Sequence, residues 1–496
     1  MHLLAIDQGT TGSTALVMAE NGATLGRSNH EFAQHFPEPG WVEHDPEEIW
    51  ASVVASVGDA LKAAQVKATE IAAIGITNQR ETTLLWDRDT DAPVHRAIVW
   101  QDRRTTARCA ELKAKGLEER VRDVTGLVLD PYFSGTKLHW LLENVEGARK
   151  SAHEGRLAFG TIDSFLVWKL AGGAAAKAPH VTDVTNASRT LLMDLAARSW
   201  SQEMCSLLDI PPAVLPRICP SAARIAETRG VPGLPDGIPI AGMAGDQHAA
   251  LFGQACFGEG EAKCTYGTGA FLLVNTGAAP IKSRFGLLST MGWQVGDEVV
   301  YALEGSCFIA GAAVQWLRDG LGLIKSAKEI EDLARSVPSS DGVVFVPALS
   351  GLGAPHWDPN ARGLISGITR GTTRAHLARA TLEAIALQVN DVVAAMSDDL
   401  GRAITRMRVD GGAAENDLLM QFQSDVSGLT VERPTELEST ARGAAMLAGL
   451  GAGIFKGGAD AAKMVKINRT FSVGMAGPER ASRRAAWADA IRRTRS

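Results

Sequence analysis

Apolar and polar positions alternate along the chain in blocks that predict strands and helices in turn. Residues 3–6 and 14–18 are apolar runs on either side of a polar, Gly-containing segment, which is typical of two strands joined by a tight turn. Asp45 precedes a proline and two glutamates, a pattern that predicts the start of a helix. Residues 71–77 and 157–161 are apolar runs of strand length. This mixture of elements indicates an α/β fold.

The second half of the chain repeats this order. Residues 263–265 and 270–275 are predicted strands around a second Gly-containing turn, and residues 308–317 form a predicted helix. Residues 407–409 form a further predicted strand. A longer predicted helix covers residues 374–396, and four of its apolar side chains are expected to face inward: Leu382, Ile385, Val389 and Val392.

Such repetition predicts two similar halves that meet near residues 250–260. We expect an N-terminal domain at 1–252, a C-terminal domain at 253–451 and a helical tail at 452–496. In the tail, Trp487 and Ile491 are expected on the buried side of a terminal helix, with the arginines on its solvent face.

Composition narrows the class of protein. A chain of 496 residues is too long for one ordinary core, and its 45% hydrophobic and 21% charged content is typical of soluble globular proteins. A net charge of −6 argues against a broad nucleic-acid-binding surface. No apolar run reaches membrane-spanning length, so we expect no membrane insertion and a cytoplasmic location. Six scattered cysteines without a C-x-x-C pair indicate neither a disulfide framework nor a zinc site.

Two short turns provide the first candidate chemistry. Residues 7–12 (Asp-Gln-Gly-Thr-Thr-Gly) and 266–269 (Tyr-Gly-Thr-Gly) each place Gly-Thr at a tight bend between predicted strands. Such a bend aims backbone N–H groups and a hydroxyl at one point, which suits a phosphate, and Asp7 is suited to hold Mg²⁺ beside it. No G-x-x-x-x-G-K-[ST] motif is present, so the turns are not P-loops. Ordinary hairpin chemistry is the alternative, but two such turns favour a nucleotide held between two similar halves.

Three polar segments follow predicted strands. Residues 78–82 are five polar side chains in a row, and their Arg80 and Glu81 are suited to the hydroxyl groups of a polyol; an exposed turn is the alternative. Asp246 is placed either to act as a base toward a hydroxyl or to cap the helix that follows. Residues 410–412 either approach a ligand closely or simply connect a strand to a helix.

Taken together, these residues resemble the FGGY carbohydrate kinase family, and within it the members that phosphorylate glycerol. The similarity runs from Asp7 to about Gly451. Eight segments carry it, at residues 39–46, 76–82, 98–101, 130–137, 244–247, 265–269, 351–355 and 408–412.

The resemblance implies two ribonuclease-H-like domains, related to the actin and sugar-kinase fold, around a central cleft. It implies ATP-dependent phosphorylation of glycerol to sn-glycerol 3-phosphate, with ATP as co-substrate and Mg²⁺ at the phosphates. It also implies a homo-oligomer, either a dimer or a tetramer.

Carried over by position, the resemblance assigns a role to each matching residue. Asp246 is the expected general base, and Asp7 and Asp246 are the expected metal ligands. The expected glycerol contacts are Arg80, Glu81, Trp100, Tyr132, Asp246, Gln247 and Phe271. The expected nucleotide contacts are Thr10, Thr11, Gly12, Thr14, Thr268, Gly311, Gln315, Gly412 and Asn416.

Three alternatives remain open at this stage. The chain is either a different FGGY kinase that acts on a pentulose or another polyol, or an actin-like or chaperone-like ATPase, or an inactive relative. An ATPase of that kind would leave the polar run 78–82 and the Asp246-Gln247 pair unexplained. Against an inactive relative, Asp7, Asp246 and both Gly-Thr turns are intact.

One segment differs from a regulatory pattern in the family. Some bacterial relatives carry a Gly-rich loop ending in arginine that binds fructose 1,6-bisphosphate. The corresponding residues 228–237 do not match that pattern, so little inhibition by this sugar phosphate is expected.

The first turn also lacks an arginine that the family usually has near the phosphates, because Thr14 stands in its place. We therefore predict that Thr14→Arg lowers the KM for ATP, since it adds a cation beside the phosphates. Steady-state kinetics at saturating glycerol would measure this. An unchanged KM would mean that another cation already fills the role.

Overall fold

The predicted first hairpin is present, and it begins a sheet. In the computed structural model, which describes residues 1–495, β1 (His2–Gln8) pairs antiparallel with β2 (Gly12–Ala19), and β2 with β3 (Thr24–Glu31). On the other side of β1, β5 (Ile71–Asn78) and then β14 (Pro239–Gly245) run parallel to it. The spatial order of this half is therefore β3-β2-β1-β5-β14.

The second half has the same topology, strand for strand. β15 (Ala262–Tyr266) and β16 (Ala270–Gly277) form the hairpin, and β18 (Glu298–Cys307) pairs antiparallel with β16. β21 (Arg406–Asp410) and β22 (Thr430–Pro434) follow in parallel on the other side of β15. The order β18-β16-β15-β21-β22 repeats that of the first half, and the predicted fold class is confirmed.

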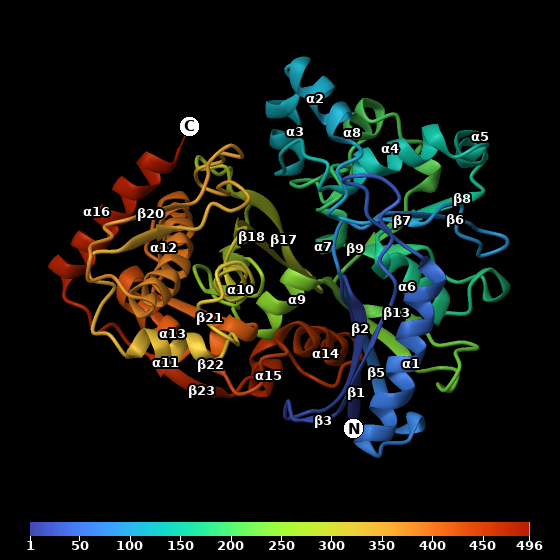
Figure 1. Cartoon of the computed structure of the whole chain (residues 1–496). Coiled ribbons are helices and arrows are strands. Elements are labelled where there is room, and N and C mark those ends of the chain that lie inside the picture. Colours follow the sequence, from blue (N-terminus) through green and yellow to red (C-terminus); the bar gives the residue numbers. More distant parts are fainter. Residues whose placement is uncertain (496) are drawn as a thin grey trace.

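The two halves share one continuous sheet. β13 (Ala222–Glu227) extends the first half beside β14, and β17 (Leu288–Val295) extends the second half beside β18. These two strands meet at a single residue pair, Ala222 with Val295. Figure 1 shows the consequence: the N-terminal half forms one lobe and the C-terminal half another, with α9 and α14 between them.

Helices cover the sheet in both lobes (Figure 1). Those of the N-terminal half are α1 (Pro46–Ala64), α2 (Thr106–Ala114), α3 (Glu118–Thr125), α4 (Ser134–Asn144), α5 (Ala148–His153), α6 (Ile162–Leu170), α7 (Val184–Ala187), α8 (Gln202–Leu207) and α9 (Asp246–Gly253). Those of the C-terminal half are α10 (Gly311–Asp319), α11 (Glu329–Arg335), α12 (Arg374–Leu400), α13 (Asp417–Ser427), α14 (Ser439–Gly451), α15 (Gly458–Ala461) and α16 (Gly477–Thr494). None of these helices within residues 1–495 is long and apolar enough to cross a membrane.

Small two-stranded pairs lie outside the main sheet. They are β4 (Glu43–His44) with β7 (Ala97–Ile98), β6 (Leu84–Asp87) with β8 (Leu157–Gly160), β9 (Val181–Asp183) with β12 (Arg217–Cys219), β10 (Met193–Asp194) with β11 (Ser199–Trp200), and β19 (Val344–Val346) with β20 (Leu364–Ser366). The predicted strand at 157–161 is therefore real, but it does not belong to the central sheet.

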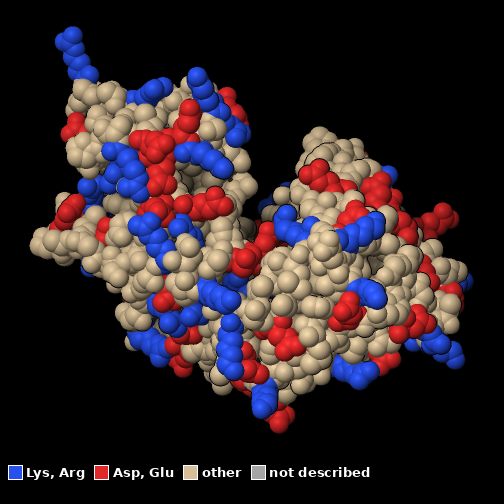
Figure 2. Space-filling model, turned by 90° about the horizontal axis from the view of Figure 1, so that it is seen from below, with Lys and Arg blue, Asp and Glu red and all other residues tan. Residues whose placement is uncertain are grey.

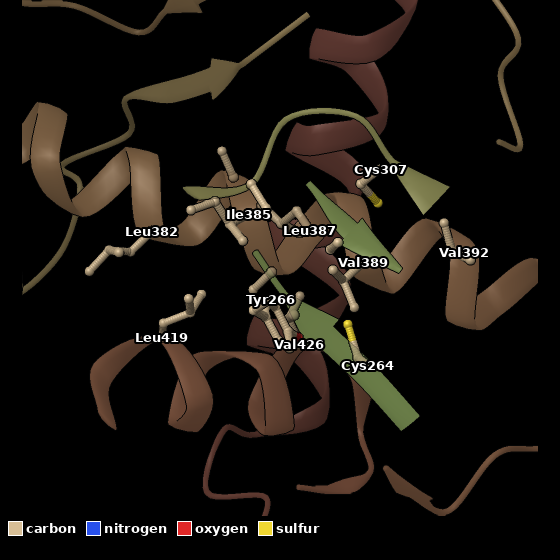
Figure 3. Packing of buried hydrophobic residues seen from close by; sticks show 14 of the residues in the cluster. Cys264, Tyr266, Cys307, Leu382, Ile385, Leu387, Val389, Val392, Leu419 and Val426 are labelled. Carbon is tan, nitrogen blue, oxygen red and sulfur yellow. The ribbon is translucent and has the colours of Figure 1, made fainter. Parts of the chain in front are cut away.

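The core of the C-terminal lobe packs around α12, as predicted. All four apolar side chains expected to face inward are at most 2% exposed. In Figure 3 they lie with Tyr266 of β15 and with Leu419 and Val426 of α13. The Tyr266 hydroxyl is buried as well, and it donates a hydrogen bond of 2.8 Å to the Gln423 side chain. This core therefore anchors the strand that leads into the second Gly-Thr turn.

Two predicted features of the C-terminal half are wrong in detail. The helix expected at 308–317 begins only at Gly311, because Ala310 has φ −123° and ψ −92°, outside the helical region. The tail is not wholly helical, because β23 (Ile467–Phe471) lies in it and pairs with β22 at the edge of the main sheet.

The terminal helix α16 buries Trp487 and Ile491 as predicted, but its arginines do not all face solvent. Arg480 and Arg484 donate hydrogen bonds to the backbone carbonyls of Asp425 and Val426, at 2.6 and 2.7 Å. These carbonyls are at the end of α13, where the helix dipole favours a cation. The arginines thus attach the terminal helix to the lobe.

Glycines allow the helices α14 and α9 to pack closely against each other. A Cβ atom on Gly443 would overlap the carbonyl group of Ala249 in α9, and one on Gly253 would overlap that of Ser439. Both contacts are backbone against backbone, so no side chain can move aside. The position of α9, whose first turn carries Asp246, depends on this packing.

We predict that Gly443→Ala lowers the free energy of unfolding by about 1–3 kcal/mol, because the added methyl group forces two helices apart. Gly58→Ala in α1 is the matched control, since a Cβ there meets no atom within 4 Å. That substitution should stabilise by about 0.5–1 kcal/mol through helix propensity. Thermal unfolding would measure the free energy of unfolding of both variants. Equal changes in the two would contradict the argument that α14 is packed closely at Gly443.

Candidate active site

Three predicted site segments leave the sheet at the same edge of the first half. β1, β5 and β14 are parallel neighbours, with Gln8 beside Asn78 and Asn78 beside Gly245 in register. The first Gly-Thr turn follows β1, the polar run follows β5, and Asp246 follows β14. Because the carboxyl ends of parallel strands meet at one edge, these segments are brought together although they are far apart in the sequence.

The first Gly-Thr turn is a tight hairpin. The Gly9 amide donates to the Gly12 carbonyl at 2.9 Å, and a Cβ on Gly12 would lie 2.8 Å from the His30 carbonyl oxygen of β3. Thr11 is exposed at the tip, and the Thr10 hydroxyl oxygen accepts a hydrogen bond of 3.0 Å from Trp100 Nε1. The turn is thus rigid and open at its tip, as a phosphate cradle requires.

Thr14 lies on β2, past the turn, and its hydroxyl oxygen accepts a hydrogen bond of 2.8 Å from the Asn29 side chain. That contact occupies the side chain that stands where the family has an arginine. Threonine is uncharged, so Thr14 supplies no positive charge beside the first turn.

The second Gly-Thr turn is built in the same way and packs against the start of α10. The Gly267 amide donates to the Gly269 carbonyl at 2.9 Å. In turn the Gly311 amide donates to the Gly267 carbonyl at 3.0 Å, and a Cβ on Gly311 would lie 2.7 Å from that same oxygen. Thr268 is exposed beside this helix end. The structure thus brings Thr268 and Gly311 together, as predicted, with Gln315 exposed one helical turn further along α10.

The strand end of β21 brings the third Gly-containing segment to the second turn. Gly411 has φ +83°, and a Cβ on it would lie 2.5 Å from the Tyr266 carbonyl oxygen, so only glycine fits. Gly412 is exposed, and a Cβ on it would meet nothing within 4 Å. Asn416 caps α13 by accepting from the Leu419 amide at 2.9 Å, so its amide nitrogen is left for other contacts. An open surface thus adjoins the second turn.

The polar run after β5 is not an exposed turn. Its five residues 78–82 are all at most 3% exposed, which excludes the alternative of a surface ion pair. Glu81 also has φ +60°, a left-handed conformation that is rare for a residue with a side chain and that is found where a site requires it.

Arg80 connects the other predicted glycerol contacts. Its Nε lies 2.9 Å from Asp246 Oδ1, and its Nη2 donates to the Tyr132 hydroxyl at 3.4 Å. Gly245, and not Asp246, occupies the N-cap of α9, so the capping alternative for Asp246 is wrong. Gln247 follows Asp246 in the first turn of that helix, and both are only partly buried.

Two aromatic rings lie beside this polar group. The rings of Trp100 and Tyr132 meet edge to face with centroids 5.7 Å apart. Phe271, half-buried on β16, stands opposite Thr265 and Ser306 in the sheet of the second half. A carbon chain bordered by such rings would be shielded from water.

Sequence reasoning missed two residues that complete the site, Arg189 and Glu304. With Arg80 and Glu81 they form what we call the buried charge cluster, in which every member is at most 3% exposed. Glu304 accepts from Arg80 Nη2 and from Arg189 Nη2, each at 3.1 Å, and Arg189 Nε lies 2.6 Å from Glu81 Oε1. A glutamate in the interior of the apolar strand β18 is the signal that points to Glu304, since an unpaired charge is not buried there.

The pKa of Glu304 shows how strong this pairing is. Burial alone would raise the pKa of its carboxyl group, but the attraction of Arg189 and Arg80 outweighs burial and holds the pKa well below its usual range. Glu304 belongs to the second half of the chain, and Arg80 and Arg189 belong to the first. The cluster therefore ties the two halves together directly behind Asp246.

Asp7 and Asp246 form a second electrostatic feature. Burial, and next the negative charge of Asp246, raise the pKa of Asp7 to about 8. A buried carboxyl group beside a second carboxylate favours a bound cation. No group of three or more His, Cys, Asp or Glu side chains within residues 1–495 is arranged to hold a metal by itself. A hard cation that keeps water and phosphate ligands fits two carboxylates.

The predicted site residues thus come from both halves of the chain. The first turn, Asp7 and the polyol group come from the N-terminal half, and the second turn with α10 and residues 411–416 comes from the C-terminal half. Figure 2 shows the surface hollowed between the two lobes, with Lys and Arg mixed among Asp and Glu on both. Their ligand contacts remain predictions.

Comparisons with known proteins agree with this architecture. A sequence model for the N-terminal domain of the FGGY family of carbohydrate kinases matches residues 2–253, and one for the C-terminal domain of that family matches residues 262–452. A glycerol kinase of Myxococcus xanthus is 58% identical over 494 residues, which is 99% of each chain. A glycerol kinase of Bdellovibrio bacteriovorus is 52% identical over 492 residues, again 99% of each chain.

Solved structures are similar as well. The crystal structure of Plasmodium falciparum glycerol kinase with ADP matches with a TM-score of 0.94 at 38% identity, covering 99% of this chain and 98% of that one. A gluconate kinase from Lactobacillus acidophilus has a TM-score of 0.88 at 21% identity over 99% of this chain and 97% of its own, which shows the fold alone.

From the buried charge cluster we predict that Glu304→Gln lowers the free energy of unfolding by about 3 kcal/mol, because Arg80 and Arg189 then each lose a buried carboxylate partner. Glu432→Gln is the matched control, because Glu432 is paired with Arg408 at 3.0 Å but is less buried. This substitution should lower the free energy of unfolding by about 1 kcal/mol or less. Urea unfolding would measure both. Equal small losses would contradict a cluster that holds the two halves together.

Proposed function

The chain belongs to the FGGY family of carbohydrate kinases, and we propose that it transfers the γ-phosphoryl group of ATP to glycerol, giving sn-glycerol 3-phosphate and ADP. The observation that carries the proposal is the junction of Arg80, Asp246 and Tyr132 beside a carboxylate pair and two phosphate-type turns. It fits a short polyol: one cation, one base and one hydroxyl lie within a few ångströms of each other. The glycerol kinases that match nearly the full length support the same substrate.

Asp246 acts as the base in this proposal. The terminal hydroxyl of glycerol donates its proton to the Asp246 carboxylate, its oxygen forms a bond to the γ-phosphorus, and the bond from that phosphorus to the β,γ-bridging oxygen breaks. The electron pair of the broken bond leaves with ADP. Arg80, whose Nε lies 2.9 Å from Asp246 Oδ1, holds the carboxylate in place to receive the proton.

Positioning of the reactants, together with stabilisation of charge, provides most of the rate enhancement in enzymatic phosphoryl transfer. Arg80, Glu81, Tyr132 and Gln247 would hold the hydroxyl groups, while Trp100 and Phe271 border the carbon chain. The nucleotide would lie between Thr10–Thr14 of the first turn and Thr268 with Gly311 of the second, with Gln315, Gly412 and Asn416 at the adenosine end. Because these groups come from both lobes, closure of the cleft would align them and exclude water.

Mg²⁺ fits the Asp7–Asp246 pair. Burial, and next the negative charge of Asp246, raise the pKa of Asp7 to about 8, and a divalent cation would relieve the repulsion between the two carboxylates. Asp7 and Asp246 would hold the ion, directly or through water, together with phosphate oxygens. When bound, it neutralises charge on the β- and γ-phosphates.

The proposal also covers the oligomeric state and the cellular location. We infer a homo-oligomer, a dimer or tetramer, from family resemblance. We place the activity in the cytoplasm, where ATP is supplied, and the six cysteines are all free thiols within the described chain.

Other substrates are the competing possibility. Xylulose kinases share the fold at 21–24% identity, which shows that the fold itself does not select the substrate. ATP-to-ADP turnover by the purified chain with glycerol, dihydroxyacetone, xylulose and ribulose in parallel would decide. Glycerol should give the highest kcat/KM. A pentulose preferred over glycerol, or ADP release that needs no polyol, would overturn the proposal.

We predict that Asp246→Asn lowers kcat by about 10²–10⁴-fold, because the proton of the attacking hydroxyl then has no acceptor. ATP affinity, measured by calorimetry, should change far less. Asp297→Asn, at an exposed position in the turn between β17 and β18, is the control and should leave kcat unchanged. Unchanged turnover in Asp246→Asn would exclude the base role.

A further inference from the structure

Lys263 is a buried lysine that the mechanism above does not use. It lies on β15, three residues before Tyr266, and is 0% exposed. Its ammonium group donates to the side-chain oxygen Oε1 of Gln247 and, at 2.9 Å, to the Thr265 hydroxyl. Gln247 belongs to α9 of the first half, so this contact crosses from one half of the chain to the other.

This lysine is not paired with a carboxylate. Within residues 1–495, no carboxylate oxygen comes within the 4.0 Å that would define an ion pair with its Nζ. Burial lowers the pKa of Lys263, and the more distant carboxylates of Asp410, Asp246 and Glu304 act in the opposite direction. A buried lysine is costly unless its donors are used. Here two of the three donors are used, and one of them holds a residue of the predicted glycerol site.

The chemistry of the contact determines how Gln247 is oriented. An ammonium group has three donors and no acceptor, whereas a carboxamide has an acceptor end and a donor end. Lys263 therefore holds the oxygen end of Gln247. The other end, Nε2, donates to no atom within residues 1–495, and the residue is only partly buried beside Asp246. The free end of the amide is thus a donor.

We propose that Lys263 is a positioning residue that keeps the Gln247 amide with its NH₂ group toward the substrate, so that Gln247 donates a hydrogen bond to the glycerol hydroxyl oxygen. This rests on the proposed function. A hydroxyl group between Asp246 and Gln247 then has one fixed arrangement: its proton points to Asp246 and its lone pair accepts from Gln247. The oxygen is held in the orientation from which Asp246 removes the proton.

Lys263 also joins the two parts of the site mechanically. It stands on the strand that carries the second Gly-Thr turn, and Thr265, its other partner, lies directly before that turn. Any movement of the second lobe that shifts β15 must either move Gln247 or break this contact. Correct orientation of the glycerol hydroxyl is thereby tied to the position of the turn that meets the nucleotide.

A double-mutant cycle with the full-length enzyme tests the proposal. Lys263→Met should raise the KM for glycerol about five- to tenfold, the equivalent of roughly one hydrogen bond, and leave the KM for ATP within about twofold. In a Gln247→Leu background the same substitution should raise the glycerol KM by less than about twofold, because the amide on which it acts is gone. Lys263→Arg keeps a donor and should stay within about threefold of the unaltered enzyme.

Two outcomes would overturn the proposal. One is an unchanged glycerol KM in Lys263→Met. The other is an equal rise in both backgrounds, which would mean that Lys263 supports only the fold. If the unaltered chain turns over no glycerol, the proposed function fails together with this inference, whereas normal turnover with either of these outcomes removes the inference alone.

Gln247→Glu provides a second test that does not depend on how Lys263→Met folds. It keeps an oxygen for Lys263 and the size of the side chain, but it removes the donor. Glycerol is uncharged, so the added charge does not by itself repel it. The glycerol KM should rise about tenfold or more. A retained KM would show that Gln247 presents its oxygen, and not its NH₂ group, to the substrate.

Discussion

Burial of four charges where the two lobes meet is the constraint on which the rest of the site depends. Glu304 accepts hydrogen bonds from both Arg80 and Arg189, and without it these buried guanidinium groups would keep only Glu81 and the partly exposed Asp246 as carboxylate partners. Removing charges from water costs several kcal/mol each unless they are paired and hydrogen-bonded. The pairing is complete only when β18 of the second half lies behind the polar run of the first. The group that orients Asp246 therefore exists only in the assembled molecule.

The repeated topology explains why two turns of the same kind face one cleft. Each half begins with a hairpin, and each hairpin turn is followed in space by the carboxyl ends of parallel strands. Glycines make the close contacts possible: Gly411 against Tyr266, and Gly311 against Gly267. In the proposed function the first half supplies the polyol contacts and the base, and the second half supplies the adenosine end of the nucleotide site. Two contacts join the halves directly: Glu304 of the second half pairs with Arg80 of the first, and Lys263 of the second half donates to Gln247 of the first.

Much of the fold followed from local patterns, and the failures have physical reasons. Leu382, Ile385, Val389 and Val392 were predictable because helical spacing places them on one face. The start of α10 was misplaced, because apolar residues next to Gly311 fit a helix or an extended segment equally well. The arginines of α16 were expected in water, since nothing local to that helix shows the carbonyl groups of α13 that two of them bind.

By itself the sequence determined the α/β class and the duplicated order of elements, and it indicated which short polar segments are candidates for chemistry, because these are properties of neighbouring residues. Only the tertiary structure decided that the run 78–82 is buried, that Gly245 and not Asp246 is the N-cap of α9, and that Arg189, Glu304 and Lys263 contact one another or the predicted site residues. These partners are separated by tens to hundreds of residues. A charge or a lysine in an apolar strand shows that a partner is needed, but only the packing of one half against the other shows which partner it is.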